Sequence, residues 1–125
     1  MKAVLRSFFS LSVIALALTS VGPQADAAAR GIYDGRWSVV IYTLRGDCDR
    51  SLRYSLRIEN NRVLGEEQSY QVQGAVARSG AIRVTVAEGG RSASGSGRLV
   101  GNTGRGQWQT STGECAGQWA AERRG

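Results

Sequence analysis

Apolar and polar residues alternate with a period of two along most of the chain, and this pattern constrains the fold more than any other feature. Leu52, Tyr54, Leu56 and Ile58, for example, are separated by polar or charged residues, which is typical of a strand with one buried face. Short turn signals separate the alternating runs, at 60–61, 67–68, 79–80, 89–90, 101–104 and 111–113. The pattern predicts about eight strands, near 36–44, 51–59, 62–66, 69–77, 81–88, 92–100, 105–110 and 115–122.

Strands joined by such short turns form an up-and-down meander, which has long unpaired edges unless the sheet closes or splits. The two cysteines, Cys48 and Cys115, follow the first predicted strand and open the last. In a meander with an even number of strands these positions lie at the same end, and closure brings them together. We therefore expect an all-β fold, a small antiparallel up-and-down barrel of about eight strands tied by a Cys48–Cys115 disulfide.

Residues 1–27 have the parts of a secretory signal peptide: a basic start with Lys2 and Arg6, an apolar stretch over 8–18, and small residues around 25–27 for cleavage. The apolar stretch is short for a membrane-spanning helix. The alternative is an N-terminal anchor that is retained.

Cleavage would leave one domain over 28–125, periplasmic or secreted, with no transmembrane segment. Export favours oxidation of the cysteine pair. This domain contains no His and no Lys, so the commonest general base and the Ser-Lys dyad are both missing. We expect no catalytic residues, no metal and no cofactor, and hence a protein that is not an enzyme.

The three tryptophans fall in the inward phase of the predicted strands, as does Tyr54. With hairpins closing at 101–104 and 111–114, Gly97 and Gly117 would face Trp108, and Gly106 would face Trp119. Each indole would then lie over a bare backbone. We expect these rings, with Trp37, to fill the interior of a small barrel. The alternative for 92–97 is a flexible loop of low complexity.

A Gly-x-Trp stands at the start of the first predicted strand, Gly35 to Trp37, and the last strand carries Trp119 and ends in Arg123 and Arg124. This resembles the calycin pattern of lipocalins, avidins and small bacterial metalloprotease inhibitors. The resemblance implies that Trp37 closes one barrel end and that Arg123 or Arg124 covers it. It also implies the alternative functions of a periplasmic protease inhibitor or a small-ligand carrier. Trp108 and Trp119 are expected to be structural because they fall in the inward phase of their strands.

The stretch from Tyr33 to Arg124 is similar to a group of small uncharacterised exported bacterial proteins, sometimes labelled as exoproteins of heme utilisation or adhesion. The matching residues are Asp34-Gly-x-Trp37, Gly46-Asp-Cys-Asp49, Tyr54, Arg57-Ile58, Gly95-x-Gly-Arg-Leu99, Gly106-x-Trp108 and Cys115-x-Gly-x-Trp-x-Ala-Glu-Arg123. The resemblance implies no activity. Tyrosines are the only axial ligands that 28–125 would offer a heme, because it has no His or Met and its cysteines are expected to be oxidised.

Charged residues suggest two further sites. Asp47, Asp49 and Glu114 flank the cysteines and would gather at one barrel end, where they could bind calcium or simply form turns. The net charge is +6, and Lys2 is the only basic residue that is not arginine. The candidate anion-binding surface consists of outward arginines on the second and fifth predicted strands, Arg53, Arg57 and Arg83.

An acidic polymer or an envelope protein is therefore a candidate partner, and an ordinary soluble surface is the alternative. Specific nucleic-acid binding is not expected, because aromatic residues are not interleaved with these arginines. Val40, Tyr42 and Leu44 form an outer apolar stripe that either 28–33 or a partner would cover. The favoured function is an exported, non-catalytic binding or envelope-associated module, and an interior cavity would favour the carrier instead.

Overall fold

The computed structural model describes residues 14–17 and 31–125 of the chain. It has eight strands, each within two residues of its predicted range: β1 (Gly35–Arg45), β2 (Ser51–Glu59), β3 (Arg62–Gly65), β4 (Gln71–Val76), β5 (Ala81–Glu88), β6 (Arg91–Val100), β7 (Thr103–Thr110) and β8 (Ala116–Arg123). The predicted signal peptide lies outside the described residues except for 14–17, and it stays a prediction. In the part of the chain that the structure describes, no helix has the length and apolar character needed to cross a membrane.

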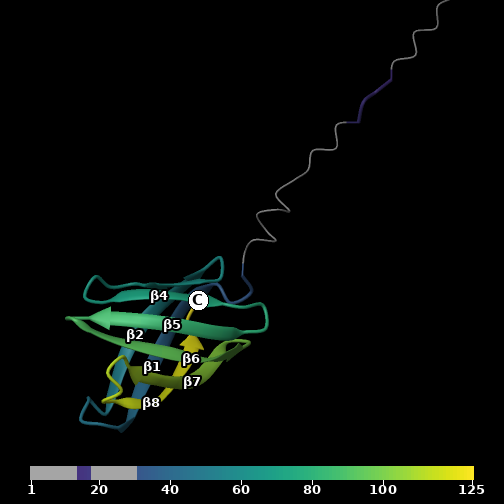
Figure 1. Ribbon diagram of the computed structural model, residues 1–125. Helices are drawn as coiled ribbons and strands as arrows, with labels where there is room; N and C mark the ends of the chain where they lie inside the picture. Colours follow the sequence, from purple (N-terminus) through teal and green to yellow (C-terminus); the bar gives the residue numbers. More distant parts are fainter. Residues whose placement is uncertain (1–13, 18–30) are drawn as a thin grey trace, which may run out of the picture.

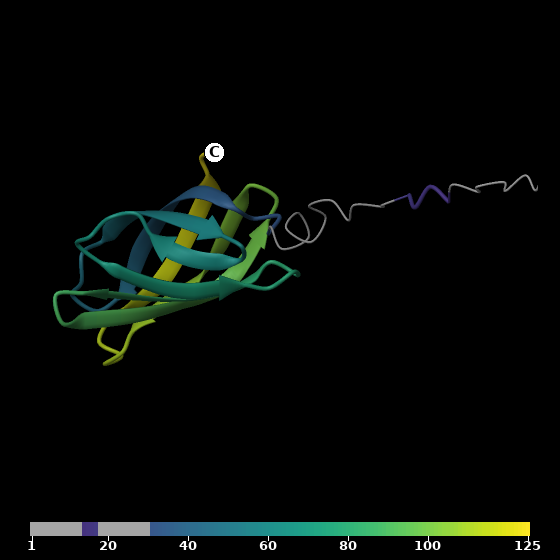
Figure 2. The same cartoon turned by 90° about the horizontal axis from the view of Figure 1, so that it is seen from above.

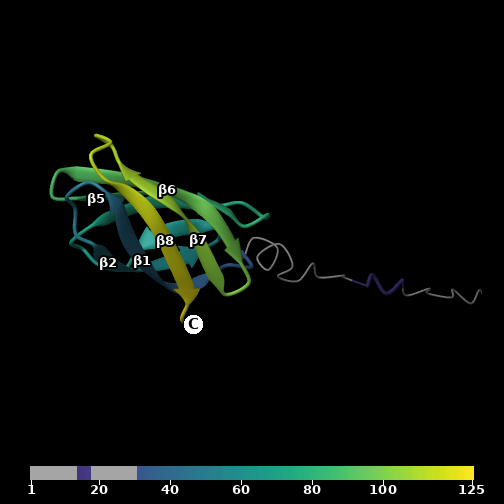
Figure 3. The same cartoon turned by 90° about the horizontal axis from the view of Figure 1, so that it is seen from below.

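The strands form a closed antiparallel barrel, as the alternation and the cysteine positions predicted (Figure 1). Each strand pairs with the next one along the chain, and β8 returns to pair with β1. Figure 3 shows β8 between β1 and β7, which is where the sheet closes. Closure removes the unpaired edges that an open meander of this length would expose.

Connections of two to five residues join neighbouring strands and lie at the two ends of the barrel (Figure 2). The β2–β3 turn has Asn60 and Asn61 at φ values of 51° and 66°, and the β5–β6 turn has Gly89 and Gly90 at 58° and 79°. Two successive residues in the left-handed region match the twist of a two-residue hairpin, and Asn and Gly adopt that region at low cost.

One predicted register is wrong. Residues Val100 and Thr103 pair directly, so the β6–β7 turn is shorter than the predicted loop at 101–104. Trp108 therefore opposes Gly95 rather than Gly97 on this side. The other two predicted pairs, Trp108 with Gly117 and Gly106 with Trp119, are confirmed.

The buried core is concentrated at the barrel end where β1 begins, which we call the closed end. Trp37, Ile58, Val63 and Leu99 are each exposed by 3% or less. They come from β1, β2, β3 and β6, so apolar side chains from all around the barrel meet there. Tyr33, just before β1, is also buried in this cluster.

The predicted disulfide is confirmed at the opposite end. Cys48, in the β1–β2 loop, is bonded to Cys115, which directly precedes β8, with the two Cα atoms 6.2 Å apart. The bond joins two loops that lie far apart in the sequence, because β1 and β8 are neighbours in the closed sheet.

Candidate functional site

The end of the barrel that carries the disulfide encloses a cavity of about 640 Å³ that opens to solvent. The prediction of a filled interior is therefore wrong for this half of the barrel. The cavity lies inside the barrel, between the buried closed end and the loops around the disulfide. Its apolar walls are formed by Val39, Ile41, Leu52, Leu56, Val84, Val86, Ala93, Trp108 and Trp119.

Leu56, Trp108 and Trp119 are buried, but the rest of the apolar wall is only partly buried although its side chains point inward. Val39, Ile41, Val84 and Val86 pack against the core on one side and remain partly accessible on the other. Leu52 has an exposed fraction of 42%, although it pairs with Ile41 and shares its inward face. Part of the apolar wall is therefore accessible to solvent, and an apolar molecule would cover it favourably.

The indole of Trp119 explains why the cavity is not filled. Its Nε1 donates a hydrogen bond to the carbonyl oxygen of Ser96 on the wall, at 3.2 Å. A methyl group at Gly97 would lie 2.6 Å from Cζ2 of Trp119, and one at Gly106 would lie 2.7 Å from its Cε2. The ring thus lies flat on the glycine backbone of β6 and β7 instead of projecting toward the barrel axis.

The Trp108 indole is held against the wall in the same way as that of Trp119. Its Nε1 donates to the carbonyl oxygen of Tyr42, at 3.0 Å, and lies 2.9 Å from where a methyl group at Gly117 would stand. Glycines opposite the tryptophans were recognised in the sequence, but their consequence was missed. An indole that replaces the missing side chains of its neighbours thickens the wall and leaves the centre open.

Trp37 lines the floor of the cavity at the other end, and Arg123 covers the Trp37 ring. The Trp37 Nε1 donates to the carbonyl oxygen of Tyr33 at 2.8 Å, and the Arg123 guanidinium lies 5.1 Å from the centre of the Trp37 ring. The same guanidinium donates to the carbonyl oxygens of Ile32 and Asp34, at 3.0 and 2.8 Å. Arg124 instead pairs with Glu122.

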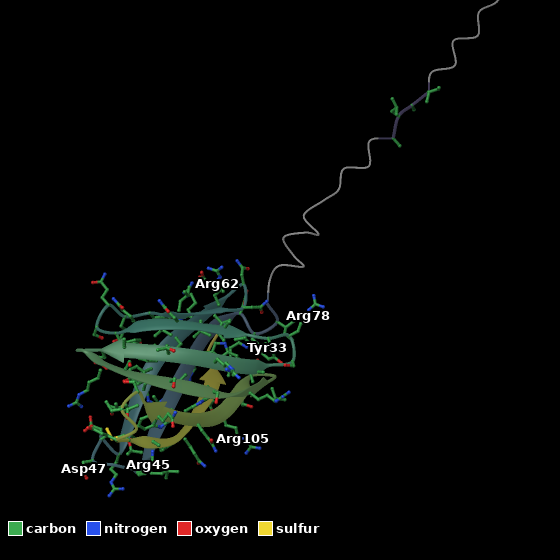
Figure 4. The ribbon with its side chains drawn as sticks, in the orientation of Figure 1. Tyr33, Arg45, Asp47, Arg62, Arg78 and Arg105 are labelled. Atoms are coloured by element: carbon green, nitrogen blue, oxygen red, sulfur yellow. A yellow bond between two sulfur atoms is a disulfide. The ribbon has the colours of Figure 1, made fainter. Side chains whose placement is uncertain are left out.

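Acidic side chains surround the mouth of the cavity. Asp47, Asp49 and Glu114 lie on the two loops around the disulfide, and Glu88 ends β5. Figure 4 shows Asp47 at this end of the barrel, away from Tyr33. Arg91 is the only basic residue among the described residues that line the cavity. The residues that line the mouth therefore have an acidic balance, although Arg45 and Arg50 lie on or next to the same loops and the chain as a whole is basic.

Tyr54 connects the apolar wall with this acidic mouth. Its hydroxyl donates to Oε2 of Glu88 at 3.3 Å, and its ring meets that of Tyr70 edge to face, with centroids 4.9 Å apart. Burial raises the pKa of the Tyr54 phenol above its ordinary value, and the negative charge of Glu88 raises that pKa further. Tyr54 therefore stays a neutral hydrogen-bond donor at physiological pH.

Sequence reasoning missed Glu88 and Arg91 as residues of the mouth. They oppose each other across the β5–β6 turn, and Glu88 continues the inward phase of Ile82, Val84 and Val86. This inward phase is the sequence signal that could have identified Glu88 as a residue of the mouth. A charged residue at the end of an apolar inward series indicates an interior that is open there.

The calcium interpretation of the mouth gains no support. Among residues 14–17 and 31–125, no three His, Cys, Asp or Glu side chains are grouped closely enough to hold a metal ion. Asp47, Asp49 and Glu114 lie around one opening but are not gathered into such a group.

The three arginines of the candidate anion-binding surface do not form one cluster. Arg57 is ion-paired with Glu59 at 3.1 Å and with Glu66 at 3.6 Å. Arg53, also on β2, donates to the Ser38 hydroxyl at 3.1 Å. Arg83 is exposed on β5, separated from β2 by two strands.

The outer apolar stripe on β1 remains uncovered by residues 31–33. Tyr42 and Leu44 are exposed by 45% and 68%, whereas Tyr33 packs into the closed end. Residues 28–30, the rest of the segment expected to cover the stripe, lie outside the described residues.

The position of the Trp119 ring gives a matched pair of expected results. Gly97→Ala should lower the free energy of unfolding by about 1–3 kcal/mol, because the new methyl would collide with the Arg105 carbonyl oxygen and the Trp119 ring. Gly95→Ala should be tolerated, since its methyl would make an ordinary contact, 3.4 Å from Nε1 of Trp119. Urea unfolding of both variants checks this. Equal stabilities would contradict an indole lying flat on this wall.

Comparison with protein-family models and with curated proteins finds no match for this chain.

Proposed function

We propose that this protein is an exported, non-catalytic carrier that holds one small, largely apolar molecule in the open half of its barrel. The observation behind this proposal is the cavity of about 640 Å³ with apolar walls and a single open end. Ligand pockets in proteins typically have volumes of about 300–1,000 Å³, with mainly apolar linings and a few polar groups that fix orientation. The cavity favours this carrier over a barrel that acts only through its outer surface.

Export is part of the proposal, and the disulfide supports it. Structural disulfides persist in oxidising compartments such as the periplasm or the extracellular medium. The calycin resemblance supports the carrier too, because Arg123 lies over Trp37 as that resemblance implies. Catalysis is not proposed, since the chain has no His and its only lysine is Lys2.

The mouth indicates which ligands would bind best. A bound amphiphile would place its apolar part against Val39, Ile41 and Val84 and leave its polar end near the carboxylates. Each pair of opposite charges that face each other in a water-exposed setting stabilises binding by roughly 0.5–1 kcal/mol. We therefore propose a preference for an uncharged or cationic end, and discrimination against an anionic one.

Fluorescence titration with N-phenyl-1-naphthylamine, a neutral apolar probe, tests the carrier function. We expect saturable binding of one probe molecule per chain, because the probe would cover apolar wall that is accessible to solvent. Displacement by matched ten-carbon competitors then tests the head-group preference. Decyltrimethylammonium should displace the probe about ten times more effectively than decanoate, with decanol between them.

Different results would contradict the carrier function and the head-group preference. Absence of saturable probe binding by folded, disulfide-bonded protein would contradict the carrier function itself. Saturable binding with equal displacement by all three competitors would leave the carrier and remove the role of the acidic mouth. The cationic preference should also weaken as salt is raised, because salt screens exposed charges.

A further inference from the structure

The outer wall of the barrel carries arginines that lie near one another and form no ion pair within the described residues. Arg98 on β6 directly opposes Arg105 on β7. Arg83 on β5 opposes Ser96, so it is the diagonal neighbour of Arg98 on the same outer face. On the other side, Ala75 of β4 lies between Arg83 and Arg62. These four exposed arginines, Arg62, Arg83, Arg98 and Arg105, form what we call the arginine strip.

The strip crosses five neighbouring strands, from β3 to β7. At about 4.8 Å between strands, it runs for roughly 19 Å around the barrel. Figure 4 shows its two ends, Arg62 and Arg105, on either side of the wall formed by β4, β5 and β6. This surface lies outside the barrel and is separate from the cavity.

No arginine of the strip forms an ion pair within the described chain: Glu59, which directly opposes Arg62, is ion-paired with Arg57 instead. The ion pairs of residues 31–125 involve Arg36, Arg57 and Arg124, none of which belongs to the strip. Arg98 donates only to a backbone carbonyl, that of Ser79, at 3.3 Å. Like charges placed directly opposite each other destabilise a sheet. A bound anion would remove this unfavourable interaction.

The side chains next to the strip indicate which anion fits. Outward positions along β6 and β7 carry Ser94, Ser96, Gln107 and Gln109, all exposed. Hydroxyl and amide groups of this kind can donate to and accept from the hydroxyls of sugars. On β5, β6 and β7 the outward positions include no aromatic ring on which a nucleic-acid base could stack. They also include no carboxylate that would repel an anion.

We propose that the arginine strip is a binding surface for an acidic polysaccharide, with its guanidinium groups contacting carboxylate or sulfate groups along the polymer. Arginine suits this role because its planar fork pairs with such oxyanions through two parallel hydrogen bonds. The serine and glutamine side chains contact the sugar hydroxyls. The surface would bring the carrier to an anionic polymer and leave its cavity mouth free.

Binding of fluorescently labelled heparin and polygalacturonate fragments, followed by anisotropy over a range of salt concentrations, tests this proposal. Arg98→Gln/Arg105→Gln should weaken binding at least tenfold at low salt and reduce the slope of log Kd against log salt by about two. The control is Arg36→Gln/Arg124→Gln, which removes the same charge from arginines that are already ion-paired. It should change affinity by no more than about twofold, because these two arginines lie outside the strip and their charges are already paired with carboxylates.

Equal losses in the two double variants would overturn the proposal, because net charge would then account for all binding. Tighter binding of duplex DNA or of anionic lipid vesicles than of either polysaccharide by the parent protein would overturn the ligand class. Arg98→Gln/Arg105→Gln should melt no lower than the parent, since it removes a like-charge pair, and should still bind the cavity probe. These two readouts show that a loss of polysaccharide binding does not result from misfolding or from a failed carrier function.

Discussion

Replacing Trp37 with alanine should lower the free energy of unfolding by about 3–5 kcal/mol, the usual cost of truncating a large core side chain. The ring is only 3% exposed and lies at the closed end, where buried side chains from most of the strands meet. Its loss would also leave the Tyr33 carbonyl without its donor and the Arg123 guanidinium without the ring below it. Urea unfolding followed by circular dichroism measures the effect.

Trp37→Phe is the matched control, because it keeps an aromatic ring at the closed end and removes the indole N–H. We expect it to cost about 1 kcal/mol, as for the loss of one buried hydrogen bond. If Trp37→Ala unfolded at the same urea concentration as the parent, the closed end would not depend on this side chain and the floor of the cavity would have to be sought elsewhere.

Removing the disulfide should have an effect of similar size. Cys48 and Cys115 are 67 residues apart in the sequence, and closing a loop of that length restricts the unfolded chain by about 4 kcal/mol in the loop-entropy description. Cys48→Ala/Cys115→Ala should lose about that much stability. The parent protein treated with a reductant should lose a similar amount, which separates the effect of the bond from that of the alanines.

The bond also fixes the mouth, because it joins the loop with Asp47 and Asp49 to the loop with Glu114. Reduced protein that is still folded should therefore bind the apolar probe more weakly. An unchanged unfolding midpoint after complete reduction would contradict the role of this crosslink in holding the two ends of the barrel sheet together.

The fold could be predicted because the signals that determine it are local. Alternation places Leu52, Tyr54 and Leu56 on one face, and turn residues such as Asn60 and Asn61 end each run. Closure was predictable from the even strand number and the positions of the cysteines. None of these inferences requires knowledge of how far a side chain reaches into the interior.

The cavity was missed because it depends on the direction of the indole rings. Trp108 and Trp119 were correctly placed inside and, for two pairs, opposite the right glycines. The sequence alone then suggested that these rings fill the centre of the barrel. The hydrogen bonds from their Nε1 atoms to wall carbonyls instead hold the rings against the sheet.

The arginine strip could not be predicted because the predicted β6–β7 turn was too long. A loop over 101–104 would have placed Arg98 opposite Gln107, and the two arginines would not have faced each other. The tighter turn, in which Val100 pairs with Thr103, moves Arg105 opposite Arg98. Turn length sets the register of the whole hairpin, so an error of two residues changed every cross-strand pair in it.

Filling the cavity tests whether the open half of the barrel is a ligand site. Ala93 on β6 lines the cavity, whereas Thr85 on β5 faces outward and is exposed. Ala93→Trp should abolish saturable binding of N-phenyl-1-naphthylamine, and Thr85→Trp, which adds an indole outside the barrel, should bind it as the parent does. Both variants should retain the circular dichroism spectrum of the parent. Folded Ala93→Trp protein that binds the probe with parental affinity would contradict a ligand site in the open half of the barrel, because the probe would then occupy some other surface.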